Sequence, residues 1–222
     1  MDSDPARALT VDVVSDVVCP WCYIGKRRLE SALATLATRD PGRVAQIRWH
    51  PFQLNPGLPP DGVDRRAYVE SKFGGPARAA QVYERVRAAG RTVDIPFAFE
   101  AISRQPNTQL AHRLIAWAQS AAAPDVGMLV ERLFRAYFLE GRFIGDPAEL
   151  VRIAAESGLD ATAVRALLDS DRFAPEVRAS NERAQAAGID GVPFFVFDGK
   201  VAVGGAQEPD VLLDAIAAAD RA

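Results

Sequence analysis

The sequence predicts an α/β fold in which a β-α-β unit and a β-β-α unit enclose a long helical insertion. Three observations support this fold class. A β-branched segment at residues 11–18 is followed by a helical pattern, the middle of the chain is helical in its periodicity, and two short β-type segments lie near the end. We therefore divide the chain into residues 11–55, a helical insertion at 60–187 and residues 188–220.

The first unit is defined by its breakers and its hydrophobic periodicity. Residues 11–18 predict a strand, and Pro20 stands at the favoured first position of a helix that extends to residue 38. Asp40-Pro41-Gly42 predicts a turn, and residues 44–49 predict a second strand. Strand, helix and strand together form the β-α-β unit.

The rest of the chain divides at capping residues, glycines and prolines. Asp146-Pro147 is a strong helix start, and Asp198-Gly199 predicts a tight turn between the two late strands. We expect an extended segment or loop at residues 91–106, where two prolines interrupt the pattern. The expected helices cover residues 64–73, 76–89, 107–122, 125–139, 146–158, 160–168, 175–187 and 208–219, and the late strands cover 192–197 and 200–203.

The composition excludes several classes of function. The chain has 222 residues, of which 49% are hydrophobic and 25% charged, with a net charge of −3 and a pI near 5.5. This acidic balance does not favour nucleic acid or an anionic membrane as a partner. No apolar segment approaches the ~18 residues of a membrane span. Residues 1–10 lack the basic and apolar regions of a secretory signal, so we expect a cytoplasmic protein.

Only two cysteines are present, Cys19 and Cys22. A disulfide across so short a loop stabilises a protein by only about 2 kcal/mol, and a chain of this length builds its own core. Cys19 ends a strand and occupies the cap position of the following helix, where free backbone N–H groups and the helix dipole favour a thiolate. Cys22 lies one turn later on the same face. We expect Cys19 to attack a disulfide and Cys22 to resolve the mixed disulfide.

Two other interpretations of the cysteine pair remain. Half of a zinc site also has this spacing, but the remaining ligands would have to come from His50, His112 or carboxylates, and the histidine spacing matches no common zinc motif. No metal is therefore expected. Alternatively, the two thiols are inert core residues.

A second signal lies far away in the sequence, at Gly191-Val192-Pro193, directly before the β-type segment of residues 194–197. Proline is tolerated at the first residue of a strand, and only ~5–6% of bonds before proline are cis in folded proteins. From these residues alone, a trans proline at a strand start is favoured.

The chain resembles the DsbA-like family of thioredoxin-fold oxidoreductases, and within it the FrnE-like branch that is related to hydroxychromene-carboxylate isomerases. The resemblance is carried by residues 19–26, which contain Cys19-Pro20-Trp21-Cys22, by residues 51–56 and 133–138, and by residues 188–195 and 204–207. It implies a thioredoxin-like fold with a helical insertion. It also implies that Pro193 is cis, that its loop lies against Cys19 and shields the sulfurs from metal, and that the Val192 backbone pairs with an extended substrate.

Two departures from this family leave the oxidising strength open. The DsbA type has a histidine between its cysteines, where this chain has Pro20 and Trp21. DsbA and thioredoxin also have an acid six residues before the nucleophile, where this chain has Val13.

Other residues near the cysteines have two interpretations each. Asp16 is a candidate proton relay, although a solvated carboxylate is favoured. His112 is a candidate substrate contact, although a structural histidine is favoured. Trp21 offers apolar contact to a substrate or packs against the insertion. Residues 26–28 are basic and are candidates for lowering the pKa of Cys22, although a solvated face is favoured.

Thiol–disulfide exchange with a protein or small-molecule thiol or disulfide is the leading function. It needs no cofactor beyond the redox-active disulfide, with glutathione as a possible thiol partner. A glutathione-dependent isomerase or transferase is the first alternative, although that branch has serine at the first active-site position, where this chain has Cys19. A non-catalytic, chaperone-like binding protein is the second. The sequence leaves monomer and homodimer open.

Overall fold

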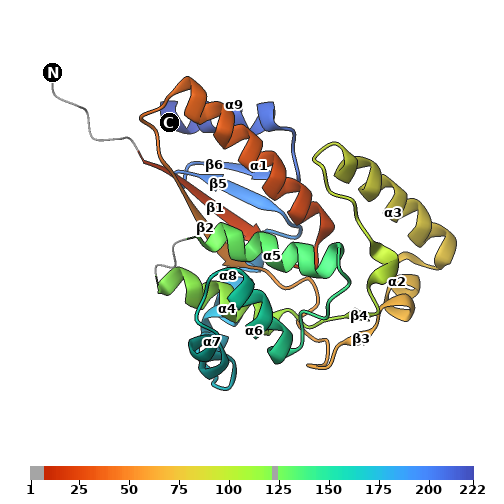
Figure 1. Ribbon diagram of the computed structural model, residues 1–222. Coiled ribbons are helices and arrows are strands. Elements are labelled where there is room, and N and C mark those ends of the chain that lie inside the picture. The colour runs from red at the N-terminus through yellow and green to blue at the C-terminus, as the bar shows by residue number, and fades with distance from the viewer. Residues whose placement is uncertain (1–7, 122–124) are drawn as a thin grey trace.

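The computed structural model describes residues 8–121 and 125–222, and its main sheet joins the two ends of the chain. The strand order is β2-β1-β5-β6 (Figure 1). Strand β1 is parallel to β2 and antiparallel to β5, and β5 is antiparallel to β6. This mixed sheet with a helical insertion confirms the predicted fold class. The strands are β1 (Leu9–Ser15), β2 (Ala45–Pro51), β5 (Phe194–Phe197) and β6 (Val201–Gly204).

Two helices belong to the sheet units, and they pack against each other. They are α1 (Pro20–Arg39) and α9 (Pro209–Arg221). Pro20 is the first residue of α1, as the sequence predicts. The central strands are buried, since Val11 and Val13 of β1 and Phe195 and Phe197 of β5 are at most 2% exposed. This apolar core fixes the ends of β1 and β5, where the site lies.

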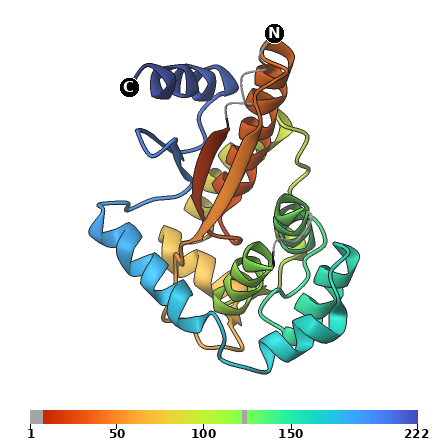
Figure 2. The same cartoon turned by 90° about the vertical axis from the view of Figure 1, so that its left-hand side faces the viewer.

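Seven α-helices separate β2 from β5 within the described residues; most of them lie at the end of the sheet away from the C-terminus, whereas α3 (Pro76–Arg91) lies beside α1 (Figures 1 and 2). The expected helix at 107–122 begins at Gln109, and Ala122 lies outside the described residues, as do residues 1–7. The helices are α2 (Arg65–Phe73), α3 (Pro76–Arg91), α4 (Gln109–Ser120), α5 (Val126–Phe138), α6 (Pro147–Glu156), α7 (Ala161–Leu168) and α8 (Ala174–Ala186).

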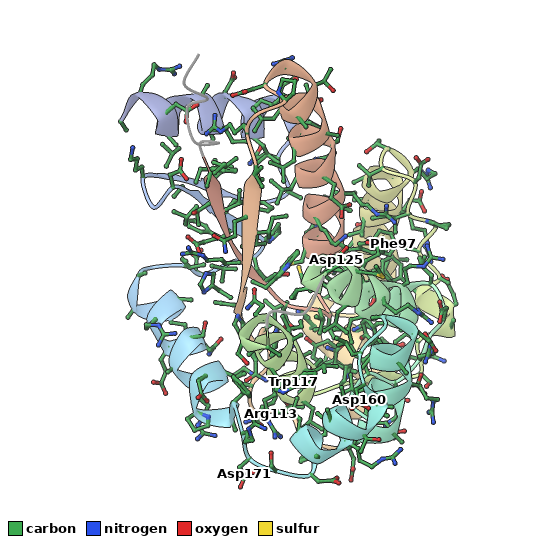
Figure 3. All side chains as sticks on the ribbon, turned by 60° about the vertical axis from the view of Figure 1, so that its left-hand side comes forward. Phe97, Arg113, Trp117, Asp125, Asp160 and Asp171 are labelled. Carbon is green, nitrogen blue, oxygen red and sulfur yellow. The ribbon has the colours of Figure 1, made fainter. Side chains whose placement is uncertain are left out.

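Aspartates begin several of these helices, as their cap positions predict. The carboxylates of Asp125, Asp146 and Asp160 each accept a hydrogen bond from a backbone N–H group of the first turn. Figure 3 labels Asp125 and Asp160 at the starts of α5 and α7. The buried guanidinium of Arg113, also labelled there, donates to the carbonyl oxygens of Leu167 and Arg172 and so fixes the connection from α7 to α8.

The expected loop at residues 91–106 contains more structure than the sequence predicts. A short 3₁₀ helix, η1 (Phe99–Ala101), is followed by β4 (Arg104–Gln105), which pairs with β3 (Val63–Asp64). The expectation was incomplete because a two-residue strand carries no hydrophobic period. In the described part of the chain, no helix is long and apolar enough to cross a membrane.

An aromatic cluster joins the insertion to α1. The Tyr23 ring stacks on Phe134 of α5 with centroids 4.9 Å apart, and Phe97 packs edge-on against Phe138 at 5.3 Å. Such pairs add about 0.5–1.5 kcal/mol each to the burial of their surfaces. Tyr23 follows Cys22 directly, so this cluster holds the first turn of α1 against the insertion.

Candidate active site around Cys19 and Cys22

Cys19 occupies the cap position of α1, where extended backbone meets the first helical turn. Its φ and ψ angles are −93° and 113°, and its side chain is 6% exposed. The Cys19 thiol donates to the carbonyl oxygen of Val192 across 3.5 Å. The Val192–Pro193 peptide bond is cis, which is the geometry that the family resemblance implies. The trans proline favoured by the residues alone is therefore wrong, because tertiary packing selects the isomer in a folded chain.

Sheet pairing brings this loop to Cys19. Val14 of β1 pairs with Phe194 of β5, so the residues before β5 lie beside the residues after β1. The backbone N–H of Gly205 donates to the Pro193 carbonyl at 2.8 Å and fixes the loop from its other side. Gly25 of α1 leaves room for it, since a Cβ there would lie 2.8 Å from Cγ of Pro193.

The surroundings of Cys19 favour its thiolate. A hydrogen bond from the Cys22 thiol lowers the pKa of Cys19 most strongly. Burial raises that pKa, as does the charge of Asp16, while the backbone N–H groups of Cys22 and Trp21 lower it. No capping hydrogen bond of standard geometry reaches the sulfur. The net shift is downward, which increases the fraction of the nucleophilic form.

The surroundings of Cys22 have the opposite effect. Cys22 is 2% exposed, and burial raises its pKa well above the usual range of a cysteine. The neighbouring Cys19 raises the pKa further, whereas donation from the Ser15 hydroxyl lowers it. Cys22 therefore keeps its proton under conditions in which Cys19 ionises. Of the two thiols, Cys19 is therefore the more readily ionised.

A cavity of about 200 Å³ opens beside Cys19, between the start of α1 and helices α2 and α3. Trp21 lines it with 39% of its surface exposed. Its polar lining includes Arg65, Tyr68 and Lys72 from α2. The cavity combines an aromatic wall with two cationic side chains, next to the sulfur that carries the thiolate.

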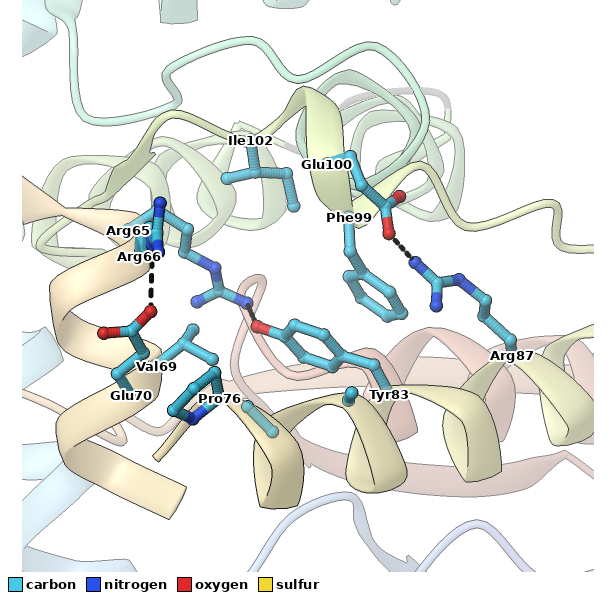
Figure 4. A pocket seen from close by; sticks show the side chains of 12 residues that line it. Arg65, Arg66, Val69, Glu70, Pro76, Tyr83, Arg87, Phe99, Glu100 and Ile102 are labelled. Carbon is cyan, nitrogen blue, oxygen red and sulfur yellow. Dashed lines mark hydrogen bonds and ion pairs between the residues drawn. The ribbon is translucent and has the colours of Figure 1, made fainter. Parts of the chain in front are cut away.

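A second cavity of about 510 Å³ lies on the other side of Arg65 and is drawn in Figure 4. The Arg65 guanidinium donates to the Tyr83 hydroxyl at 2.8 Å, and both side chains line both cavities. Figure 4 also shows the ion pairs Arg66–Glu70 and Arg87–Glu100 at the rim. The Arg65–Tyr83 pair thus forms a shared wall.

Asp16 and His112 lie together beneath the cysteines. Asp16 is 0% and His112 2% exposed, and the distance from Nε2 of His112 to Oδ1 of Asp16 is 3.2 Å. Oδ2 of Asp16 accepts from the backbone N–H of Leu54 at 2.8 Å. The expected solvated carboxylate is therefore wrong, because α4 and the segment after β2 cover the end of β1. His112 does not line the cavity beside Cys19.

The basic residues after Cys22 do not form the expected solvated face. Lys26 is 4% exposed and pairs with Glu131 of α5 at 2.9 Å. Arg28 is 8% exposed and donates to the carbonyl of Ala206 at 2.6 Å. Helix α5 and the loop before α9 cover this face of α1, and only Arg27 stays about one-third exposed.

Two contributors to the site were not found from the sequence, although each left a signal. Ser15 follows Val11 and Val13 with the period of two that places side chains on one face of a strand. Gly25 is three positions after Cys22, where a small residue on the thiol face indicates close approach of another segment.

Comparison with known proteins identifies the family and the fold. Residues 10–217 match the family model described as "DSBA-like thioredoxin domain". The "probable DsbA oxidoreductase" of Streptomyces coelicolor is 32% identical, with a TM-score of 0.84 over 96% of this chain and 90% of that one. The uncharacterized protein YwbO of Bacillus subtilis is 27% identical over 93% of this chain and 94% of its own length. The cytosolic disulfide reductase DsbM of Pseudomonas aeruginosa, solved with GSH, shares the fold at 17% identity and a TM-score of 0.59, with 96% of each chain covered. The chain therefore belongs to the family of DSBA-like thioredoxin domains.

Proposed function

We propose that this protein is a thiol–disulfide oxidoreductase that works through Cys19 and Cys22. The Cys19 thiolate attacks one sulfur of a substrate disulfide, forms a mixed disulfide and releases the other sulfur as a thiolate. Cys22 then attacks the Cys19 sulfur, the substrate leaves as its second thiolate, and the protein keeps the disulfide. The reverse sequence oxidises a dithiol. The observation that carries this proposal is the position of Cys19 at the cap of α1, 3.5 Å from the Val192 carbonyl and one turn before Cys22, and the opposite pKa shifts of the two cysteines support it.

The loop at Val192 and Pro193 serves in this proposal as the substrate-binding wall. The Val192 carbonyl faces the Cys19 sulfur at 3.5 Å, so an extended substrate that pairs with the Val192 backbone has its own sulfur near Cys19. Trp21, on the other side of the sulfur, supplies exposed aromatic surface for apolar groups of the substrate.

Replacement of Cys19 by serine tests the function. We expect the Cys19→Ser variant to lose reduction of insulin disulfides and oxidation of a dithiol peptide to the uncatalysed rate, since a hydroxyl at this position forms no mixed disulfide. A chaperone-like activity is indifferent to the change, and a glutathione-dependent isomerase activity survives it. Exchange activity that persists in a folded Cys19→Ser protein contradicts the proposal.

A small thiol such as glutathione is the second partner that we propose. Arg65 is 9% exposed, and within residues 8–121 and 125–222 it forms no ion pair with a carboxylate. A buried cation without a counter-ion is costly, and a carboxylate of glutathione in the cavity beside Cys19 would balance it. The likeness to a cytosolic reductase solved with GSH supports the same partner and a cytoplasmic setting, where glutathione keeps thiols reduced.

A further inference from the structure

Resolution of the mixed disulfide requires Cys22 to lose its proton at a position with little access to bulk water. Cys22 is 2% exposed and its pKa is raised. Val13 stands six residues before Cys19, so no acid is present at that position of β1. The proton must leave through other groups that face Cys22 from the closed side of the site.

Ser15 is the first such group. Its side chain lies near enough to Cys22 to lower the pKa of that thiol, and it is 6% exposed. Ser15 and His112 both line a small internal cavity beneath the end of β1. The space available to the centre of a water molecule there is about 10 Å³, which accommodates one water between polar partners.

His112 lines the same cavity and has two ring nitrogens, of which Asp16 contacts one. With the proton of the neutral ring on Nε2, that nitrogen donates to Oδ1 of Asp16 and leaves Nδ1 as the acceptor. Asp16 stabilises the imidazolium that forms, and its other oxygen is held by the Leu54 backbone N–H. Both side chains are at least 97% buried, so the pair is shielded from bulk water.

We propose that Ser15, one water molecule and His112 carry the Cys22 proton away during resolution, with Asp16 as the residue that positions and stabilises His112. A bond forms between the Cys22 and Cys19 sulfurs, and the bond from Cys19 to the substrate sulfur breaks. The leaving thiolate takes the electron pair of the broken bond. The proton passes from Cys22 through the Ser15 hydroxyl and the water to His112. The proposal rests on the proposed exchange function.

The other ionisable groups around the pair leave this role to His112. Cys19, at the cap of α1, also faces Asp16. During resolution its sulfur is bonded to the substrate in the mixed disulfide, so it cannot accept the proton. Tyr137 faces Asp16 from α5, and burial raises the pKa of its phenol, so it stays protonated at neutral pH. His50 also lines the small cavity, but its side chain is 41% exposed and pairs with Asp12 at 2.7 Å.

A chromogenic aromatic disulfide, 5,5′-dithiobis(2-nitrobenzoate), separates the two steps in a stopped-flow experiment with the reduced protein. Attack by Cys19 releases the first coloured thiolate, and resolution by Cys22 releases the second. In Ser15→Ala and His112→Asn we expect the second release to slow at least about tenfold at neutral pH, while the first changes little. The logarithm of the slowed rate should rise by about one per pH unit, because hydroxide then removes the proton.

Matched variants keep the experiment decisive. Ser15→Thr retains the hydroxyl, so its second release should have the wild-type pH profile and not that of Ser15→Ala. His50→Asn changes the only other histidine of the chain and should leave the second release unchanged. If loss of His112 prevents folding by leaving Asp16 unpaired, Ser15→Ala decides alone.

The outcomes separate the relay from the function on which it rests. If the second release in Ser15→Ala keeps the wild-type rate and pH profile, the relay is wrong, while disulfide exchange is still supported. A folded Cys19→Ser protein that still catalyses exchange overturns the function itself.

Discussion

The two sides of the cysteine pair differ in what faces each sulfur. On the open side, Cys19 lies under the Val192 carbonyl, beside a cavity of about 200 Å³ with cationic side chains. On the closed side, Cys22 faces Ser15, and the buried Asp16–His112 pair lies nearby. The pKa of Cys19 is lowered, chiefly by the hydrogen bond from Cys22, and the pKa of Cys22 is raised, chiefly by burial.

This difference shows that the surroundings of each sulfur, and not the Cys-x-x-Cys spacing alone, decide which of the two thiols ionises first. Both residues are cysteines, both are buried, and they are three positions apart on one helix. Burial opposes ionisation of both thiols, and donated hydrogen bonds decide which of them ionises first. Cys22 donates to Cys19, so one thiolate is favoured at the expense of the other.

We expect the greatest change when Cys22 is removed, because the difference in pKa between the two thiols is then lost. In Cys22→Ala, catalytic turnover through an internal disulfide should be lost and mixed disulfides with substrate should accumulate. The midpoint of Cys19 alkylation, measured as the rate with iodoacetamide against pH, should rise towards the ordinary cysteine value of ~8.5, because the hydrogen bond that lowers the Cys19 pKa most is gone.

Cys22→Ser is the matched control for that shift. It also lacks turnover but keeps a hydroxyl donor, so its Cys19 midpoint should lie below that of Cys22→Ala. Equal midpoints in the two variants would show that the Cys22 hydrogen bond does not set the Cys19 pKa.

An intermediate effect is expected on the open side from Gly25→Ala. The new Cβ would lie 2.8 Å from Cγ of Pro193 and must displace the loop that faces Cys19. Overpacking of this kind costs about 1–3 kcal/mol, partly offset by the better helix propensity of alanine. We expect a lower thermal midpoint and about tenfold slower exchange with a peptide substrate.

Gly57→Ala is the control for that change, because a Cβ at Gly57 meets no atom within 4 Å. It should leave both measurements near wild type. A Gly25→Ala protein with wild-type exchange rates would mean that the position of the Pro193 loop does not limit the reaction.

The smallest effect concerns the cavity beside Cys19. Lys72 is an exposed cationic residue of its lining, and an exposed ion pair contributes about 0.2–1 kcal/mol. Lys72→Met should therefore raise the KM for glutathione about two- to fivefold with kcat unchanged. Arg66→Met, on the same helix but outside this cavity, should leave the KM unchanged. Equal KM values in both variants would argue against a glutathione carboxylate at Lys72.

Local signals made much of the fold predictable. Pro20 and Asp146 marked helix starts that the structure confirms, and the change of period near residue 192 located the final strands. The two-residue strands β3 and β4 were missed because they exist only as each other's partners. Asp16 was misjudged for a related reason, since the residues that cover it are distant in sequence.

Two thiols one turn apart, the first at the cap of a helix that Pro20 begins, could be predicted from the sequence. Those features depend on neighbouring residues, so local rules capture them. The surroundings of each sulfur could not be predicted by such rules, because they come from segments that are distant in the chain. Pairing of β1 with β5 brought Val192 to Cys19, and packing of α4 beneath β1 buried Asp16 against His112. Contacts between distant segments depend on how the whole core packs, and no short stretch of sequence encodes that packing.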